Sequence, residues 1–194
     1  MDLPIRGHFQ GNDHVIYNGS FFYLHYDSES IVRYDLTTLF SSKIRIPRNR
    51  VVRNSGLPLL TKLYGPQQRD NYLDLNADEN GVWGVFGLAV DNNTVVMKFD
   101  PQTLEIQFMW NISLSHHQVA DMFIVCGVLY AVDHVEERDT RIRFALDLYK
   151  NKLLDVELPF SNPFKFTTAL GYNPRINVRF KIQSLHASVI GRLD

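Results

Sequence analysis

Three glycine-led segments of the chain repeat the same order of features, and this repeat limits its possible folds more than any other feature. Each has a turn glycine, an apolar strand, a polar turn and a second strand that ends in aspartate. The glycines are Gly19, Gly81 and Gly127, and the aspartates are Asp35, Asp100 and Asp147. The last two glycines are 46 positions apart and the last two aspartates 47. Repeats of about 40–50 residues with four short strands each are typical of propeller blades.

The segments between the turns predict strands. They are short, alternate in polarity and contain many of the thirteen Phe and nine Tyr residues of the chain. The turn formers Asn18-Gly19, Asn80-Gly81 and Asp91-Asn92-Asn93 separate them, and such residues accept the positive φ of tight hairpins. We therefore predict an all-β fold of about four blades, with an ordinary β-sandwich as the alternative.

Composition narrows the class of protein. The chain has 194 residues, 45% of them hydrophobic, and a net charge of −1, which predicts one folded domain over 1–194 and argues against disorder. No window is apolar enough for a membrane helix, and residues 1–8 do not resemble a signal peptide. We interpret the basic run Lys43 to Arg53 as a solvated loop and expect no nucleic-acid partner.

Residues 71–83, with the sequence NYLDLNADENGVW, resemble the most recognisable segment of the olfactomedin domain, which contains Asp-Leu-x-x-Asp-Glu-x-Gly-Leu-Trp. Three further matches occur in the family's order: 14–23 with 31–36, then 119–130, then 156–160 with 171–175. The resemblance covers residues 7–175 and leaves 176–194 as a divergent tail in place of the closing strand.

The resemblance implies a function and a location. Olfactomedin domains are five-bladed β-propellers that act as extracellular, non-catalytic protein-recognition modules in cell adhesion, matrix organisation or receptor–ligand signalling. We therefore expect a secreted protein that binds extracellular or cell-surface proteins and does not insert into membranes. Five blades need about 225–250 residues. We accordingly expect an incomplete propeller, truncated at both ends.

The resemblance also implies a calcium ion in the central channel. Its ligands would be the carboxylates of Asp74 and Asp121 and the carbonyls of Met122 and Leu170. Gly171 stands where the family has a further aspartate, so one oxygen donor is missing, although Asp121 adds charge where the family commonly has asparagine. The alternative is that Asp74 and Asp121 are structural groups of the channel.

Two kinds of modification are expected. Sequons at Asn18, Asn92 and Asn111 predict N-glycosylation, with Asn92 the best candidate because it lies in an expected hairpin tip. Cys126 is the single cysteine of the chain and cannot form an internal disulfide. The resemblance implies that its partner is a cysteine upstream of this sequence.

Catalysis would have to use either His116, His117, Asp121 and Cys126 or the carboxylates Asp74, Asp78 and Glu79. We expect Cys126 to lie inside an apolar strand, where burial makes a thiol inert. Within the second set, Asp78 and Glu79 are better explained as part of a hairpin tip at residues 78–81 than as an acid–base pair. The sequence therefore predicts no enzyme. A propeller hydrolase that uses channel carboxylates and a truncated product with little activity remain as alternatives.

Overall fold

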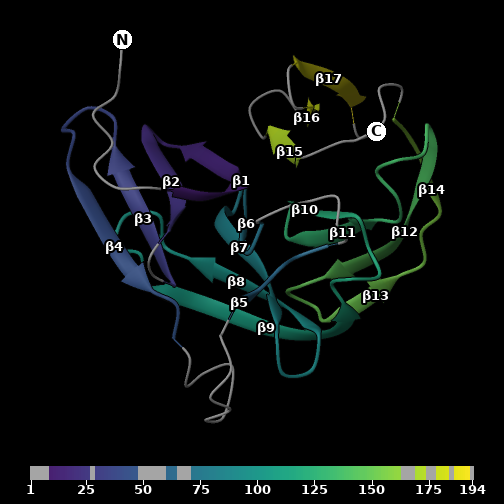
Figure 1. Cartoon of the computed structure of the whole chain (residues 1–194), viewed down its shortest axis with the longest axis horizontal. Helices are drawn as coiled ribbons and strands as arrows, with labels where there is room; N and C mark the ends of the chain where they lie inside the picture. The colour runs from purple at the N-terminus through teal and green to yellow at the C-terminus, as the bar shows by residue number, and fades with distance from the viewer. Residues whose placement is uncertain are drawn as a thin grey trace.

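The computed structural model describes residues 9–26, 29–47, 60–64, 71–162, 169–173, 178–183 and 186–192. Every regular element in these ranges is a β-strand, and every strand pairing is antiparallel (Figure 1). Among these residues there is no helix with the length and apolar character needed to cross a membrane.

The described strands form four sheets. The first contains β1 (Phe9–Tyr17), β2 (Ser20–His25), β3 (Ser30–Asp35) and β4 (Ser41–Arg45). The second contains β5 (Leu60–Thr61), β6 (Asp74–Asp78), β7 (Gly81–Leu88), β8 (Asn93–Phe99) and β9 (Ile106–Ser115). The third contains β10 (Asp121–Val125), β11 (Val128–Val132), β12 (Asp139–Asp147), β13 (Lys152–Leu154) and β14 (Leu158–Ser161). The fourth contains β15 (Ala169–Asn173), β16 (Val178–Gln183) and β17 (His186–Arg192).

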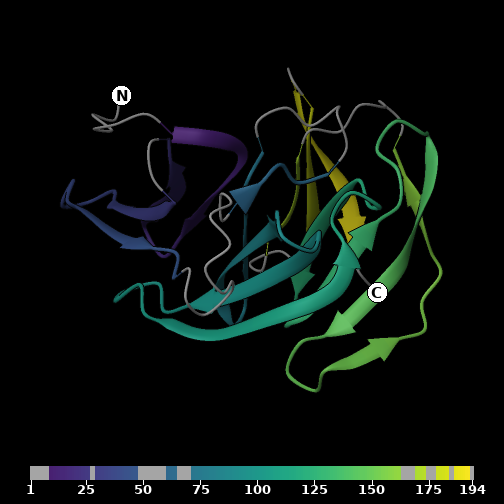
Figure 2. The ribbon, with the colours of Figure 1, turned by 60° about the horizontal axis from the view of Figure 1, so that its bottom comes forward.

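The sheets follow one another around the middle of the molecule, where β1, β6, β10 and β15 contact one another (Figures 1 and 2). Two stacked sheets would not bring one strand from each of four sheets together. The propeller prediction of about four blades is therefore confirmed, and the β-sandwich alternative is wrong.

Hydrophobic cores fill the spaces between neighbouring sheets. Members of the core between the first and second sheets include Phe22, Ile31, Phe86 and Phe99. Those between the second and third include Trp83, Val85, Met122 and Leu129. Those between the third and fourth include Phe123, Phe160 and Leu170. All eight residues of β7 are buried, as expected for a strand covered on both faces.

The repeated glycines and aspartates have the same local roles in different sheets. Asn18 and Gly19 have φ of 45° and 73°, and Cys126 and Gly127 have φ of 51° and 75°, as two-residue hairpin turns of type I′ require. The repeated aspartates accept hydrogen bonds from backbone N–H groups of the following turn, at 2.8–3.0 Å for Asp35, Asp100 and Asp147. The repeat therefore follows from turn chemistry.

The position of Cys126 differs from our expectation. We expected it inside an apolar strand, but it is the first residue of the β10–β11 turn and is exposed. The apolar strand ends one residue earlier, at Val125. Its disulfide with a cysteine outside this sequence stays a prediction.

Asp78, the last residue of β6, joins the second sheet to the third. Its fully buried carboxylate accepts hydrogen bonds from the Trp83 indole at 2.7 Å and from the Gly127 N–H at 2.7 Å. It also accepts from the Asn80 N–H at 2.8 Å, within its own turn. The interpretation of residues 78–81 as a hairpin tip is confirmed, and this tip also contacts the hairpin of the next blade.

Candidate functional site

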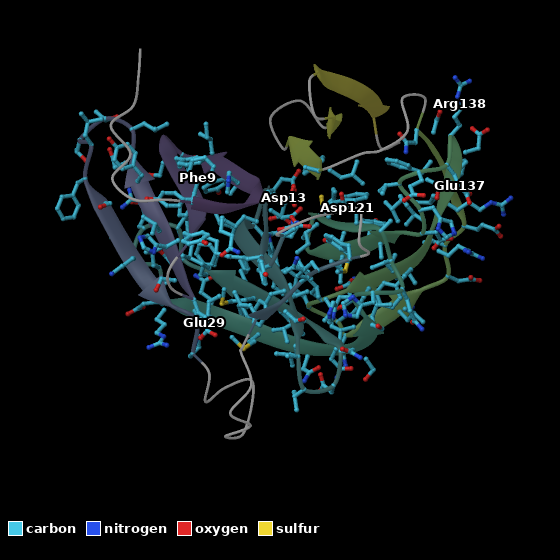
Figure 3. The ribbon with its side chains drawn as sticks, in the orientation of Figure 1. Phe9, Asp13, Glu29, Asp121, Glu137 and Arg138 are labelled. Carbon is cyan, nitrogen blue, oxygen red and sulfur yellow. The ribbon has the colours of Figure 1, made fainter. Side chains whose placement is uncertain are left out.

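Three buried aspartates come from the inner strands of three different sheets. Asp13 lies on β1, Asp74 on β6 and Asp121 on β10, and their exposed fractions are 6%, 0% and 0%. Figure 3 shows Asp13 and Asp121 at the middle of the molecule. Each lies four positions before the last residue of its inner strand, these last residues being Tyr17, Asp78 and Val125. The three aspartates therefore lie at the same distance in sequence from the ends of their inner strands, although Asp13, unlike Asp74 and Asp121, is not paired with the neighbouring strand.

Local strand geometry sets the directions of these side chains. Successive side chains of a strand alternate between faces, so Asp74 and Asn76 point to the same face of β6. The pairing of β1 with β2 is irregular between Gln10 and Val15, and Gly11 within that irregularity has a φ of 90°. Asp13 lies in this bulge, and bulges redirect side chains from the regular alternation.

Hydrogen bonds tie Asp74 to the next inner strand. Its carboxylate accepts from the Tyr64 hydroxyl and, at 3.1 Å, from the Asn76 carboxamide. The Tyr64 oxygen in turn accepts from the Met122 N–H at 3.1 Å. The Met122 N–H also donates to the Asp121 carboxylate at 2.7 Å. Tyr64 therefore links β6 to β10 at the two aspartates.

Asn76 forms a second link between β6 and β10, and Asn71 forms a hydrogen bond with Asp13. The Asn76 oxygen accepts from the Ile124 N–H of β10 at 3.3 Å. The Asn71 amide nitrogen donates to the Asp13 carboxylate at 2.6 Å. The Asn71 Oδ1 oxygen is buried and has no hydrogen-bond partner among the described residues. An unsatisfied buried oxygen is costly, and a water molecule or an ion beside it would satisfy it.

The site is electrostatically unfavourable for negative charge. No ion pair among the described residues involves Asp13 or Asp74. Burial raises the pKa of Asp74 to about 7, although its hydrogen bonds with Tyr64 and Asn76 act in the opposite direction. Burial, followed by the charges of Asp74 and Asp121, raises the pKa of Asp13 well above its ordinary value. The carboxylates need protons or a bound cation to be stable there.

The structure brings part of the predicted calcium set together. Asp74, Asp121 and Met122 share the hydrogen-bond network around Tyr64. Leu170 and Gly171 lie on β15, which contacts both β6 and β10. Within the described ranges, no group of three Asp, Glu, His or Cys side chains is close enough to hold a metal ion by itself. Any ion there would need backbone oxygens as well, and calcium stays a prediction.

Sequence analysis missed four residues of the site, namely Asp13, Tyr64, Asn71 and Asn76. The sequence repeat could have revealed Asp13, because an aspartate precedes each turn glycine. The spacing differs, however: the glycine lies six residues after Asp13 and Asp121 but seven after Asp74. Alignment on the last paired residue of each inner strand removes that offset. Tyr64 has no such signal, because it precedes β6 outside any repeated hairpin.

The other candidate catalytic groups do not form one site. The His116 ring is buried against Gly87, where an added Cβ would come within 2.6 Å of it. Burial and the neighbouring His117 lower the pKa of His116. Cys126 lies on a different hairpin, beside the Glu79 carboxylate at 3.4 Å, and partial burial and that carboxylate raise its pKa. A raised pKa leaves little thiolate for nucleophilic attack.

A family model described as "Olfactomedin-like domain" matches residues 1–180. The chain belongs to the olfactomedin family. Among similar proteins, adhesion G protein-coupled receptor L1 of Mus musculus is 32% identical over 182 residues, which are 90% of this chain and 12% of the receptor. Myocilin of Bos taurus is 28% identical over 165 residues, which are 82% of this chain and 31% of myocilin. This olfactomedin-like chain therefore spans only a minor part of those relatives.

Among solved structures, the RRP9 WD40 repeats align with 95% of the chain and 52% of their own length, at a TM-score of 0.47 and 12% identity. A structure of the nidogen/laminin complex aligns with 90% of the chain and 56% of its own, at a TM-score of 0.42 and 12% identity.

Proposed function

We propose that this olfactomedin-like domain is an extracellular, non-catalytic module that recognises cell-surface or matrix proteins. The proposal is supported chiefly by the family match over residues 1–180, together with the similarity to an adhesion receptor. Burial of the channel carboxylates also supports it. Asp74 and Asp121 have no exposed surface, so a substrate could not reach them without opening the inner strands. A channel hydrolase would need such contact.

An exposed aromatic cluster is the best candidate for the recognition surface. Phe108 and Trp110 of β9 stack at 5.6 Å between ring centroids, and Tyr149, in the turn after β12, meets both rings edge-on. Phe108 and Tyr149 are 49% and 47% exposed. Lys98 donates to the Tyr149 hydroxyl at 2.9 Å and lies over the ring. Aromatic side chains held rigidly at a surface are typical of protein-binding hot spots.

Binding of the tetramerised, fluorescently labelled protein to intact cultured cells tests this proposal. We expect saturable binding that is lost when the cells are first treated with protease but kept after heparinase treatment. Phe108→Ser should weaken binding at least tenfold. Phe40→Ser, the same change at a residue 73% exposed in the connection between β3 and β4, is the matched control and should leave binding unchanged. Binding that survives protease treatment would contradict protein recognition.

We also propose that the domain holds calcium, with Asp74, Asp121 and the carbonyls of Met122 and Leu170 as ligands. The residues fit this ion because calcium prefers carboxylate and carbonyl oxygens. In addition, no ion pair among the described residues neutralises Asp74. When bound, calcium would neutralise this charge. The hydrogen bonds of Asp74 and Met122 with the Tyr64 hydroxyl, and of the Asn76 oxygen with the Ile124 N–H, would hold β6 and β10 together around it.

Calcium is expected to raise the melting temperature by a few degrees relative to EDTA at pH 7.5. A ligand that binds only the folded state at ten times its Kd stabilises it by about 1.4 kcal/mol. Differential scanning fluorimetry measures the shift, and Asp74→Asn should remove most of it. An equal shift with magnesium, which demands stricter geometry, would show that the effect is not specific to calcium.

Asn92 is proposed as the preferred glycosylation site. It is exposed in the turn before β8 with a φ of 58°. Asn111 is also exposed, but its side-chain oxygen accepts from Asn93 at 2.8 Å, and Asn18 lies in a two-residue turn. After secretion from mammalian cells, glycosidase treatment should reduce the mass, and Asn92→Gln should remove most of that reduction. A secreted protein with an unmodified mass would contradict this assignment.

A further inference from the structure

The bulged segment of β1 carries an aspartate whose burial no described hydrogen bond or ion pair fully explains. Asp13 is 6% exposed and receives one described side-chain hydrogen bond, from Asn71 at 2.6 Å. No ion pair among the described residues involves Asp13, and its strand β1 packs against β6, which carries Asp74. A buried carboxylate without a compensating positive charge destabilises the folded state.

Its position in the repeat connects it with the other two aspartates. Asp13 lies as far from the end of β1 as Asp74 and Asp121 lie from the ends of β6 and β10. In addition, the Asn71 Oδ1 oxygen is buried beside it without a partner in the described part of the chain. Asn71 itself has no exposed surface, and its carboxamide is turned toward Asp13 by the hydrogen bond. Two oxygen-bearing groups therefore extend the site toward β1.

We propose that Asp13, together with Asn71, is part of the channel cation site and supplies negative charge from β1 to an ion held by Asp74 and Asp121. The inference rests on the calcium site proposed above. Because no three acidic side chains of the described ranges are close enough to share an ion directly, Asp13 acts on the ion through its charge. Calcium affinity depends on the number of charges around the site.

The inner strand β15 offers a second position at which a carboxylate can be introduced, and this tests the role of the Asp13 charge. Gly171 of β15 has no side chain, and an added Cβ would meet no atom within 4 Å. Its φ is not in the positive region. β15 contacts β1, β6 and β10. Gly171→Asp can therefore place a carboxylate on another side of the same site without a backbone clash.

Isothermal titration calorimetry with CaCl2 at pH 7.5 would compare the wild-type chain with Asp13→Asn, Gly171→Asp, the double variant and Asp100→Asn. We expect Asp13→Asn to raise the calcium Kd about tenfold, and the double variant to recover at least half of this loss. Asp100→Asn makes the same charge change at an exposed turn and should bind as the wild type does. Gly171→Asp alone measures the gain from a carboxylate at the position of the family's further aspartate. A role of Asp13 through its charge predicts a larger gain in the Asp13→Asn background than in the wild type, whereas a purely structural role predicts equal gains.

The outcomes separate the two proposals. Calcium binding by the wild type with an unchanged Kd in Asp13→Asn would overturn the role of Asp13 and leave the calcium site standing. No calcium binding by the wild type would overturn both. If Asp13→Asn loses its cooperative melt, Asp13→Ser supplies a smaller neutral side chain for the same titration. Binding to cells is measured separately, so neither result depends on the recognition proposal.

Discussion

Replacing Asp78 with alanine is expected to lower the free energy of unfolding by about 4 kcal/mol. The substitution leaves the buried N–H groups of Trp83 and Gly127 without an acceptor, and each such loss costs about 1–3 kcal/mol. It also breaks the contact between the hairpins of the second and third sheets. Urea unfolding monitored by tryptophan fluorescence, with its midpoint and slope, measures the change.

Two comparisons make this test specific. Asp78→Asn keeps the size of the side chain but turns an amide group with two N–H donors toward other donors, so most of the loss should remain. Asp100→Ala removes a similar pair of turn hydrogen bonds, with the Gln102 and Thr103 N–H groups, at an exposed position. A much smaller effect is expected there because water replaces the lost acceptor. Equal effects of Asp78→Ala and Asp100→Ala would contradict the role given to burial.

In EDTA, the free energy of unfolding is expected to fall by roughly 4 kcal/mol between about pH 4 and pH 8. The pKa of Asp74 is about 7 in the folded protein, against an ordinary value of 3.8 for an aspartate, so the folded state binds its proton more tightly than the unfolded chain does. The stabilisation is complete below about pH 4 and is lost as the pH rises through about 7. Asp13, whose pKa is also raised, acts in the same direction.

Urea unfolding at pH 5, 6, 7 and 8 tests this dependence. Asp74→Asn should flatten it, since the amide carries no ionisable proton, whereas Asp100→Asn should not. Aspartates that accept hydrogen bonds from a following turn, such as Asp35, have a lowered pKa, so their contribution to stability is lost only at more acidic pH. A wild type that gains stability from pH 5 to pH 8 in EDTA would show that the buried aspartates do not control it.

Much of the fold was predictable from the sequence because the turns depend on local chemistry. The hairpin glycines need a positive φ, and the aspartates that end the second strands accept hydrogen bonds from the next turn. Both requirements restrict residue type at fixed spacing, so the repeat could be read directly. Cys126 was misplaced because cysteine is not a usual turn former and follows five buried residues of β10.

The candidate site was only partly predictable. Asp74 and Asp121 were expected from the family resemblance, and the structure brings them into one network. Asp13 lies 61 positions before Asp74, and its place beside the channel depends on the bulge in β1, which pairwise strand patterns do not reveal. The role of Tyr64 depends on contacts 10 and 58 residues away. Such contacts come from tertiary packing, which local sequence does not encode.

The arrangement of the three channel aspartates has a consequence for which assembled states can contain the site. Each comes from a different sheet, so no single blade contains enough of the site to bind an ion or to raise the pKa of a carboxyl group. The polar centre therefore exists only where strands of three sheets are packed together. A species in which one sheet alone is formed would therefore show ordinary aspartate pKa values, and the raised pKa values would mark the assembled channel.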